Sequence, residues 1–130
     1  MATITRVQTR YYEEKIPVKL MDFCNWKFTS GGSTGKDFKT FARKFKNYLK
    51  KEIPDNWEIV NYSTGHYYMY GFITDGSRYV YFSISDVRFF PGQWFNAILI
   101  RTAEHDKDYT GGSNMYTNLV GFVSNVKKLM

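Results

Sequence analysis

The sequence is poor in the residues that build disulfides and metal sites, because its 130 residues include one cysteine, Cys24, and two histidines. A single cysteine cannot form an internal disulfide, and neither an EF-hand loop nor a His-x-x-x-His pair is present. No apolar run approaches the roughly 20 residues of a membrane span, and MATITRVQTRYYEEK lacks the apolar stretch of a secretory signal. We therefore predict an intracellular, cytoplasmic protein with no membrane partner, no bound metal and no cofactor.

The sequence also lacks a complete nucleotide-binding motif, although SGGSTGKD (residues 30–37) looks like one. A P-loop has a glycine, four further residues and then Gly-Lys-Ser/Thr, so that backbone N–H groups hold the phosphates and the last hydroxyl reaches magnesium. Here Ser30 stands at the first glycine position and Asp37 at the hydroxyl position, where a carboxylate repels phosphate. The stretch is better explained as the approach to a helix, with Ser33 or Thr34 as N-cap.

What the chain does contain is a very uneven distribution of charge. Residues 36–51 hold seven basic residues and one acid, Asp37, a net charge of +6 that equals the formal net charge of the whole chain. The excess positive charge therefore belongs to one short segment.

This segment has the periodicity of an amphipathic helix. Apolar residues recur at i, i+3, i+4 and i+7 spacing from Phe38 to Leu49, and Pro54 follows, so the pattern predicts a helix over residues 36–52. The basic residues take the other face, either as a solvated surface or as a surface that contacts phosphate or an acidic protein. The candidate binding residues on this face are Lys36, Lys39, Arg43, Lys46 and Lys50.

After Pro54 the pattern changes to alternation, which indicates β-strands. HYYMYGFIT (66–74) and SRYVYFSIS (77–85) are joined by Asp75-Gly76, a dipeptide typical of a two-residue type I′ hairpin turn. The residues between the tyrosines alternate to the opposite face, which is the expected core. On the tyrosine face this turn predicts the pairs Phe72 with Tyr79, Tyr70 with Tyr81, and Tyr68 with Ser83.

The tyrosine face of this hairpin has two alternative roles. If helices cover only the other face, Tyr68, Tyr70 and Tyr81 are exposed and can stack on nucleic-acid bases, at roughly 1–3 kcal/mol per base. Alternatively, residues 1–30, which contain the strand-like IPVKLM and FCNWKF, fold over this face and bury it. No RNP1-type signature accompanies the tyrosines.

Two further strands and a second helix complete the predicted fold. The strands are WEIVNYS (57–63) and FNAILIRTA (95–103), and the helix covers residues 115–129, with Asn114 as N-cap and an apolar stripe from Tyr116 to Val126. The fold class is α+β: one domain over residues 1–130, with an antiparallel meander of about four strands in residues 57–103. A basic helix precedes the meander, a C-terminal helix follows it, and residues 1–30 are irregular or contain strands.

The polar stretch RTAEHDKDYTGGSN (residues 101–114) invites a catalytic interpretation. His105 is placed to serve as a general base with a neighbouring carboxylate, and Gly111-Gly112 to receive an anion at the start of the following helix. The ordinary alternative is a connection between a strand and a helix. No Ser/His/Asp or Cys/His set can be assembled, so we assign no catalytic residue.

A second polar stretch, SDVRFFPGQWFN (residues 85–96), crowds aromatic residues around Pro91-Gly92. Phe90 and Trp94 are candidate partner-binding residues, because interface hot spots favour exposed aromatic anchors. The alternative is that the same side chains plug the core.

These features, a lysine-rich helix, a tyrosine-rich meander, a DYTGGSN loop and no complete catalytic motif, resemble in style the small inhibitors encoded by bacteriophages and mobile elements, anti-CRISPR proteins among them. The resemblance implies a non-enzymatic binding protein in the cytoplasm of a bacterial host. Its implied partner is nucleic acid or a host nucleoprotein, for example a CRISPR effector. Two alternatives stay open: a small enzyme that acts on a phosphate-bearing substrate through His105, and a self-associating component of a larger particle.

Overall fold

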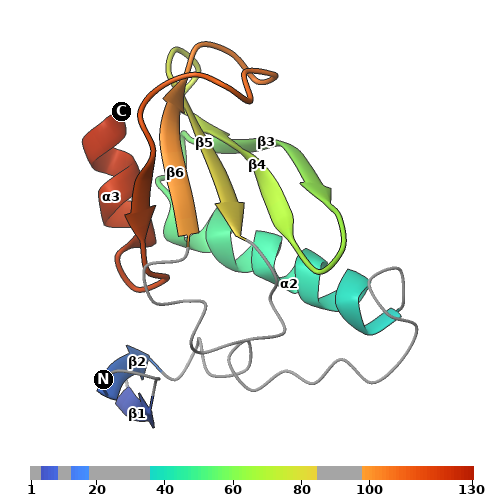
Figure 1. Cartoon of the computed structure of the whole chain (residues 1–130), viewed down its shortest axis with the longest axis vertical. Helices are drawn as coiled ribbons and strands as arrows, with labels where there is room; N and C mark the ends of the chain where they lie inside the picture. The colour runs from blue at the N-terminus through green and yellow to red at the C-terminus, as the bar shows by residue number, and fades with distance from the viewer. Residues whose placement is uncertain (1–3, 9–12, 18–35, 85–97) are drawn as a thin grey trace.

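The computed structural model describes residues 4–8, 13–17, 36–84 and 98–130, with side chains from residue 37 onward in these ranges (Figure 1). Within them lie two helices and seven strands. In chain order the elements are β1 (Ile4–Gln8), β2 (Glu13–Pro17), α2 (Lys36–Glu52), β3 (Glu58–Thr64), β4 (Met69–Thr74), β5 (Tyr79–Ile84), β6 (Ile98–Ala103), β7 (Met115–Thr117) and α3 (Phe122–Leu129).

The main sheet is a five-stranded antiparallel meander in the order β3-β4-β5-β6-β7. One helix precedes it and one follows it, which confirms the α+β class. β1 and β2 pair with one another in a two-stranded antiparallel sheet. The predicted amino-terminal strand IPVKLM overlaps the end of β2, whereas FCNWKF lies outside the described residues.

Helix α2 has the predicted bounds, because its apolar stripe is buried against the sheet. Phe38, Phe41, Phe45 and Leu49 are each at most 1% exposed. The Ile53 N–H still donates to the Leu49 carbonyl at 3.0 Å, and Pro54 then prevents the helix from continuing. The two basic residues of the last turn, Lys50 and Lys51, lie where positive charge favours the helix dipole.

The predicted C-terminal helix is wrong over its first half. Met115–Thr117 forms β7, which pairs with Ile98–Ile100 of β6, and α3 begins only at Phe122. Gly121 in the middle of the predicted helix disfavours helix by roughly 1 kcal/mol relative to alanine, whereas the edge of β6 offers Met115–Thr117 backbone hydrogen bonds. Consequently Gly121, and not Asn114, occupies the N-cap position.

The β4–β5 hairpin has the predicted faces but not the predicted register. Phe72 pairs with Tyr81 and Tyr70 with Ser83, a shift of two residues from the expected pairs. The cause is the turn: the Asp75 carboxylate accepts the N–H groups of Ser77 and Arg78 at 2.9 and 2.8 Å, which closes a four-residue loop. Because side chains alternate with a period of two, the shift leaves every side chain on its predicted face.

One face of the sheet carries the main core. Side chains of α2 and α3 share a single buried cluster with alternate residues of the strands, among them Met69, Phe82 and Ile100. Both helices therefore cover the same face. Phe72 is also 0% exposed, but it does not belong to this cluster, so it is buried on the opposite face. That face is named the open face below; besides Phe72 it carries Tyr70, Tyr81, Ser83, Leu99, Arg101 and Tyr116.

Candidate nucleic-acid interface

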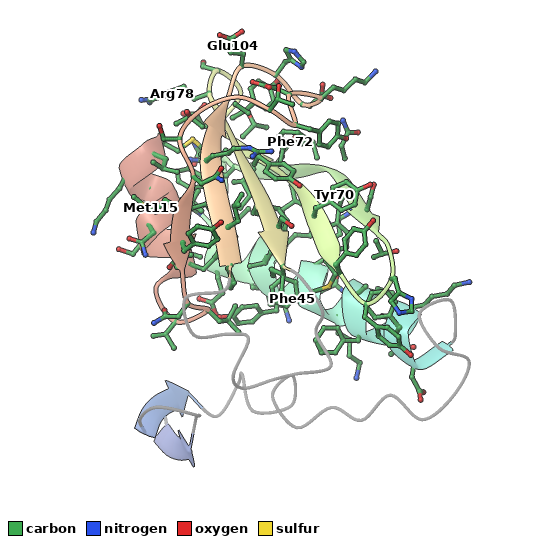
Figure 2. The ribbon with its side chains drawn as sticks, in the orientation of Figure 1. Phe45, Tyr70, Phe72, Arg78, Glu104 and Met115 are labelled. Atoms are coloured by element: carbon green, nitrogen blue, oxygen red, sulfur yellow. The ribbon has the colours of Figure 1, made fainter. Side chains whose placement is uncertain are left out.

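The open face contains a shallow pocket of about 340 Å³ lined by Tyr68, Tyr70, Tyr81, Ser83 and Tyr109. Tyr70 and Phe72 project from β4 into this region (Figure 2). The structure thus brings together the three tyrosines predicted as candidate site residues, Tyr68, Tyr70 and Tyr81. The segment that packs on them within the described ranges is the loop between β6 and β7.

Tyr109 is the residue that turns a flat aromatic surface into a pocket. The loop that carries it extends back from β6 toward β4 and β5 (Figure 1). The Tyr109 ring meets three others at steep angles, with centroid distances of 6.1 Å to Tyr70, 5.3 Å to Phe72 and 5.8 Å to Tyr81. Such edge-to-face pairs are favourable beyond their buried area. Phe72 is therefore the covered floor of the cluster, while Tyr109 itself stays 42% exposed.

Arg101 holds this loop in place. Its guanidinium donates to the backbone carbonyl of Tyr109 and to the Asn114 side-chain oxygen, the latter at 3.2 Å. The same guanidinium lies over the Tyr81 ring, 4.6 Å from its centroid. A cation in this position is attracted by the negative face of the ring. The sequence analysis named neither Arg101 nor Tyr109 as a site residue. The pairing of β5 with β6 places Arg101 opposite Tyr81, and only the folded loop brings Tyr109 to the tyrosines.

The loop is fixed from within as well. The Asp108 carboxylate accepts the N–H groups of Glu104 and Thr110 at 3.0 and 3.2 Å, and these hydrogen bonds lower the pKa of Asp108. On the neighbouring side, the Asn61 amide of β3 donates to the Asp106 carbonyl at 2.7 Å. Asn61 has φ 50 and lies where the β3–β4 register shifts, so a β-bulge aims this side chain at the loop.

Tyr68 forms the opposite side of the pocket. Its ring is stacked on Tyr70 at 5.7 Å with 25° between the planes, and it is 39% exposed. The turn before it is closed by a 3.0 Å hydrogen bond from the Gly65 N–H to the Tyr68 carbonyl. A Cβ at Gly65 would overlap the Tyr68 ring, so the close approach requires glycine.

Tyr81 is partly buried, with a hydroxyl and a cation beside it. Burial raises the pKa of Tyr81, and a side-chain hydrogen bond with Ser83 and the positive charge of Arg101 oppose that rise. Within the described residues, the Arg101 Nε is buried without a hydrogen-bond partner.

The basic surface lies on the other side of the sheet, along α2. Lys39, Arg43 and Lys50 are exposed, and Lys46 is half-buried with its Nζ 5.7 Å from the centroid of the Tyr62 ring. Their spacing places these four residues along one side of the helix, and we call them the basic stripe. Lys36 begins the helix, but its side chain lies outside the described part of the structure.

Tyr62 connects the basic stripe with the edge of the sheet. Its hydroxyl donates to the Ala42 carbonyl of α2 at 2.9 Å, and its ring lies 6.3 Å from Phe82 of the core. Burial raises the pKa of Tyr62 well above its usual range. Since Tyr62 belongs to β3, the strand at one edge of the sheet, the basic stripe flanks that edge.

The residues around His105 do not form a catalytic constellation. His105 is exposed, and its Nδ1 accepts the N–H of Lys107 at 3.1 Å, which is a local turn contact. Gly111-Gly112 do not precede a helix: Gly112, at φ 68, packs on Thr102 and leads to β7. The helix amino terminus on which that anion-site interpretation depended is therefore not there. Among the described residues no group of three or more His, Cys, Asp and Glu side chains could hold a metal.

Two features named in the sequence analysis lie outside the described residues. Phe90, Trp94 and the rest of the aromatic tip at residues 85–96 lie outside the described residues, as does Cys24. In the ranges that are described, neither helix has the length and apolar character needed to cross a membrane.

Comparison with known proteins finds no matching family model, no significantly similar curated protein and no significantly similar solved structure. The function must therefore be argued from the two surfaces themselves.

Proposed function

We propose that the protein is a non-enzymatic binding protein that contacts the phosphates of nucleic acid, free or within a host nucleoprotein, through the basic stripe of α2. The observation that carries this proposal is the alignment of Lys39, Arg43 and Lys50, all exposed, on one side of a single helix beside Lys46. Phosphate contacts by lysine and arginine supply most of the affinity in non-specific nucleic-acid binding.

Charge repulsion within α2 favours a bound ligand over a merely solvated surface. Like charges at i+3 and i+4 positions on a helix repel one another by roughly 0.2–0.5 kcal/mol per pair. This repulsion is concentrated in α2, because the positive and negative charges of the rest of the chain cancel. Phosphates placed along the stripe neutralise it and release counterions, so the same charges that cost stability in the free protein favour the complex.

The biological setting that we propose follows from the resemblance in style to phage-encoded inhibitors. A small basic protein that occupies guide RNA, target DNA or the channel that holds them would inhibit a nucleic-acid-handling complex in the bacterial cytoplasm. No observation at His105 supports an enzyme as a second candidate.

A salt series tests the proposal. Binding of purified protein to labelled single- and double-stranded DNA and RNA should weaken linearly on a logarithmic scale of salt, with a slope that corresponds to about 3–6 phosphate contacts. The variant Lys39→Gln/Arg43→Gln should weaken binding and reduce the slope by about 1.4 for a single strand. Its thermal unfolding should stay nearly unchanged, since both side chains are exposed.

The matched control removes the same charge elsewhere. Lys127→Gln/Lys128→Gln alters two exposed lysines of α3 and should leave the salt slope of the wild-type protein. If both double variants lost affinity and salt slope equally, net charge alone would drive binding. Absence of binding at low salt would overturn the nucleic-acid proposal and direct the search to an acidic protein surface.

A further inference from the structure

The pocket on the open face has a chemistry different from that of the basic stripe. Four tyrosine rings and the Ser83 hydroxyl line it, and no lysine or arginine of the described residues does. Its volume of about 340 Å³ lies at the lower end of the range for small-molecule sites. The arrangement therefore suits one small, planar, partly polar group.

The rings offer such a group a surface to stack on and an upright wall beside it. Tyr68 and Tyr70 present nearly parallel planes on one side, and Tyr109 stands at 73° to Tyr70 on the other. Aromatic faces stack on every base, and tyrosine and serine hydroxyls serve as both donors and acceptors for a base edge. The pocket thus offers both kinds of contact that a nucleobase uses.

The charges around the pocket favour a base over a phosphate as its occupant. Arg101 is engaged by the Tyr81 ring, the Tyr109 carbonyl and Asn114, so it serves the loop and does not face an incoming anion. The same loop carries three acids, Glu104, Asp106 and Asp108, against one lysine, Lys107, so its net charge is negative and disfavours phosphate. The phosphates of a bound strand must then be held elsewhere, and the basic stripe flanks the nearby β3 edge.

We propose that the tyrosine pocket receives one unstacked base of a single-stranded nucleic acid whose phosphates follow the β3 edge to the basic stripe. This inference rests on the proposed function and deepens it, because a paired base cannot enter the pocket. The protein should therefore prefer single strands to duplexes. Tyr109, held by Arg101, supplies the wall that distinguishes a pocket from a flat stacking surface.

Photocrosslinking tests the inference directly. A short single-stranded oligonucleotide with one 5-iodouracil, irradiated with the full-length protein, should crosslink to Tyr68, Tyr70, Tyr81 or Tyr109, as located by mass spectrometry. The same iodouracil within a duplex should crosslink much less. A mononucleotide, 5-iodouridine monophosphate, should bind far more weakly than the oligonucleotide because it lacks the phosphates that reach α2.

Variants separate stacking from folding. Tyr109→Ala and Tyr68→Ala should each reduce single-strand affinity about 5- to 100-fold, whereas Tyr109→Phe should retain most of it because the ring remains. Tyr116→Ala is the matched control, since Tyr116 is 57% exposed on the same face but does not line the pocket. Thermal unfolding of each variant verifies that the protein is folded.

The outcomes distinguish this inference from the function on which it rests. If binding depended on Lys39 and Arg43 but the crosslinks formed outside the four tyrosines, the base would not occupy the pocket. The proposed role of the basic stripe would be unaffected. Equal affinity for single strand and duplex would overturn the inference in the same way. A mononucleotide that binds as tightly as the oligonucleotide would also overturn it, because the site would then serve free nucleotides. No nucleic-acid binding at low salt would overturn both.

Discussion

Arg101 joins two aromatic residues that lie far apart in the sequence: its guanidinium lies 4.6 Å from the centroid of the Tyr81 ring and donates to the backbone carbonyl of Tyr109. The strand residue and the loop residue are thereby fixed relative to one another. The pocket between them depends on a residue that does not line it.

Replacing Arg101 should release the loop. Arg101→Gln removes two charge-assisted hydrogen bonds and the contact with Tyr81, and we expect a loss of about 1–2 kcal/mol in the free energy of unfolding. Urea denaturation measures this loss. Arg78→Gln is the comparison, because its ion pair with Asp75 at 3.5 Å is exposed and should contribute less than about 1 kcal/mol. Equal effects of the two substitutions would contradict the role assigned to Arg101.

Gly112 should be intolerant of a side chain. Its φ of 68 is in the left-handed region, and a Cβ there would also overlap the backbone of Thr102. Gly112→Ala should therefore destabilise the protein by about 1–2 kcal/mol or more and displace Tyr109. Gly76→Ala also strains a positive φ, but a Cβ there meets open space. Gly76→Ala should therefore reduce stability without reducing single-strand affinity. If Gly112→Ala kept wild-type affinity, the path of the loop at Gly112 would not be needed for binding.

Phe72 should be as important to stability as a residue of the main core. It is 0% exposed beneath Tyr109 and Tyr81, so Phe72→Ala should cost about 3–5 kcal/mol, and Phe72→Leu considerably less. Thermal or urea unfolding measures both. A cost below about 1 kcal/mol for the alanine variant would mean that the loop does not cover this ring in solution.

The Tyr62 hydroxyl should make stability fall at high pH. Its pKa is raised in the folded protein from the ordinary 10.0, so its contribution is fully present below pH 10 and declines as the pH rises further. Below pH 10 the wild type should be more stable than Tyr62→Phe by about 0.5–1.5 kcal/mol, from the hydrogen bond to the Ala42 carbonyl. The difference should shrink at higher pH, and a difference that grows with pH would contradict the assignment.

Local patterns predicted the parts of the fold that depend on local physics. Helix α2 follows from the apolar period and Pro54, and the faces of β4 and β5 follow from alternation. The register depended on the length of the turn. A two-residue turn would contain Asp75 and Gly76 alone, whereas the observed four-residue turn forms because the Asp75 carboxylate accepts the N–H groups of Ser77 and Arg78. The Asp75-Gly76 signal alone does not decide between them, because both turns leave the same side chains on the same faces.

The remaining errors arose where tertiary contacts decide the structure. Met115–Thr117 became a strand because β6 had an edge to pair, which the helical stripe of that segment does not reveal. The sequence around Tyr109 is polar and invites a catalytic interpretation. It contains no pattern that predicts the contacts of the Tyr109 ring with β4 and β5. The one available sign is that Tyr109 is the single Phe, Tyr or Trp in RTAEHDKDYTGGSN, since an aromatic ring in a polar loop favours packing on a neighbouring surface.

Strand β4 separates two sets of side chains, one that faces the helices and one that faces the pocket. On one side, Met69 and Ile73 belong to the helix-covered core. On the other side, Tyr70 lines the pocket and Phe72 is buried beneath Tyr109. Substitutions at the exposed rings of the open face can thus change the surface chemistry of the protein without disturbing the packing between the sheet and the helices. This separation makes the sheet a platform on which new specificity can evolve, or be engineered, at little risk to the fold.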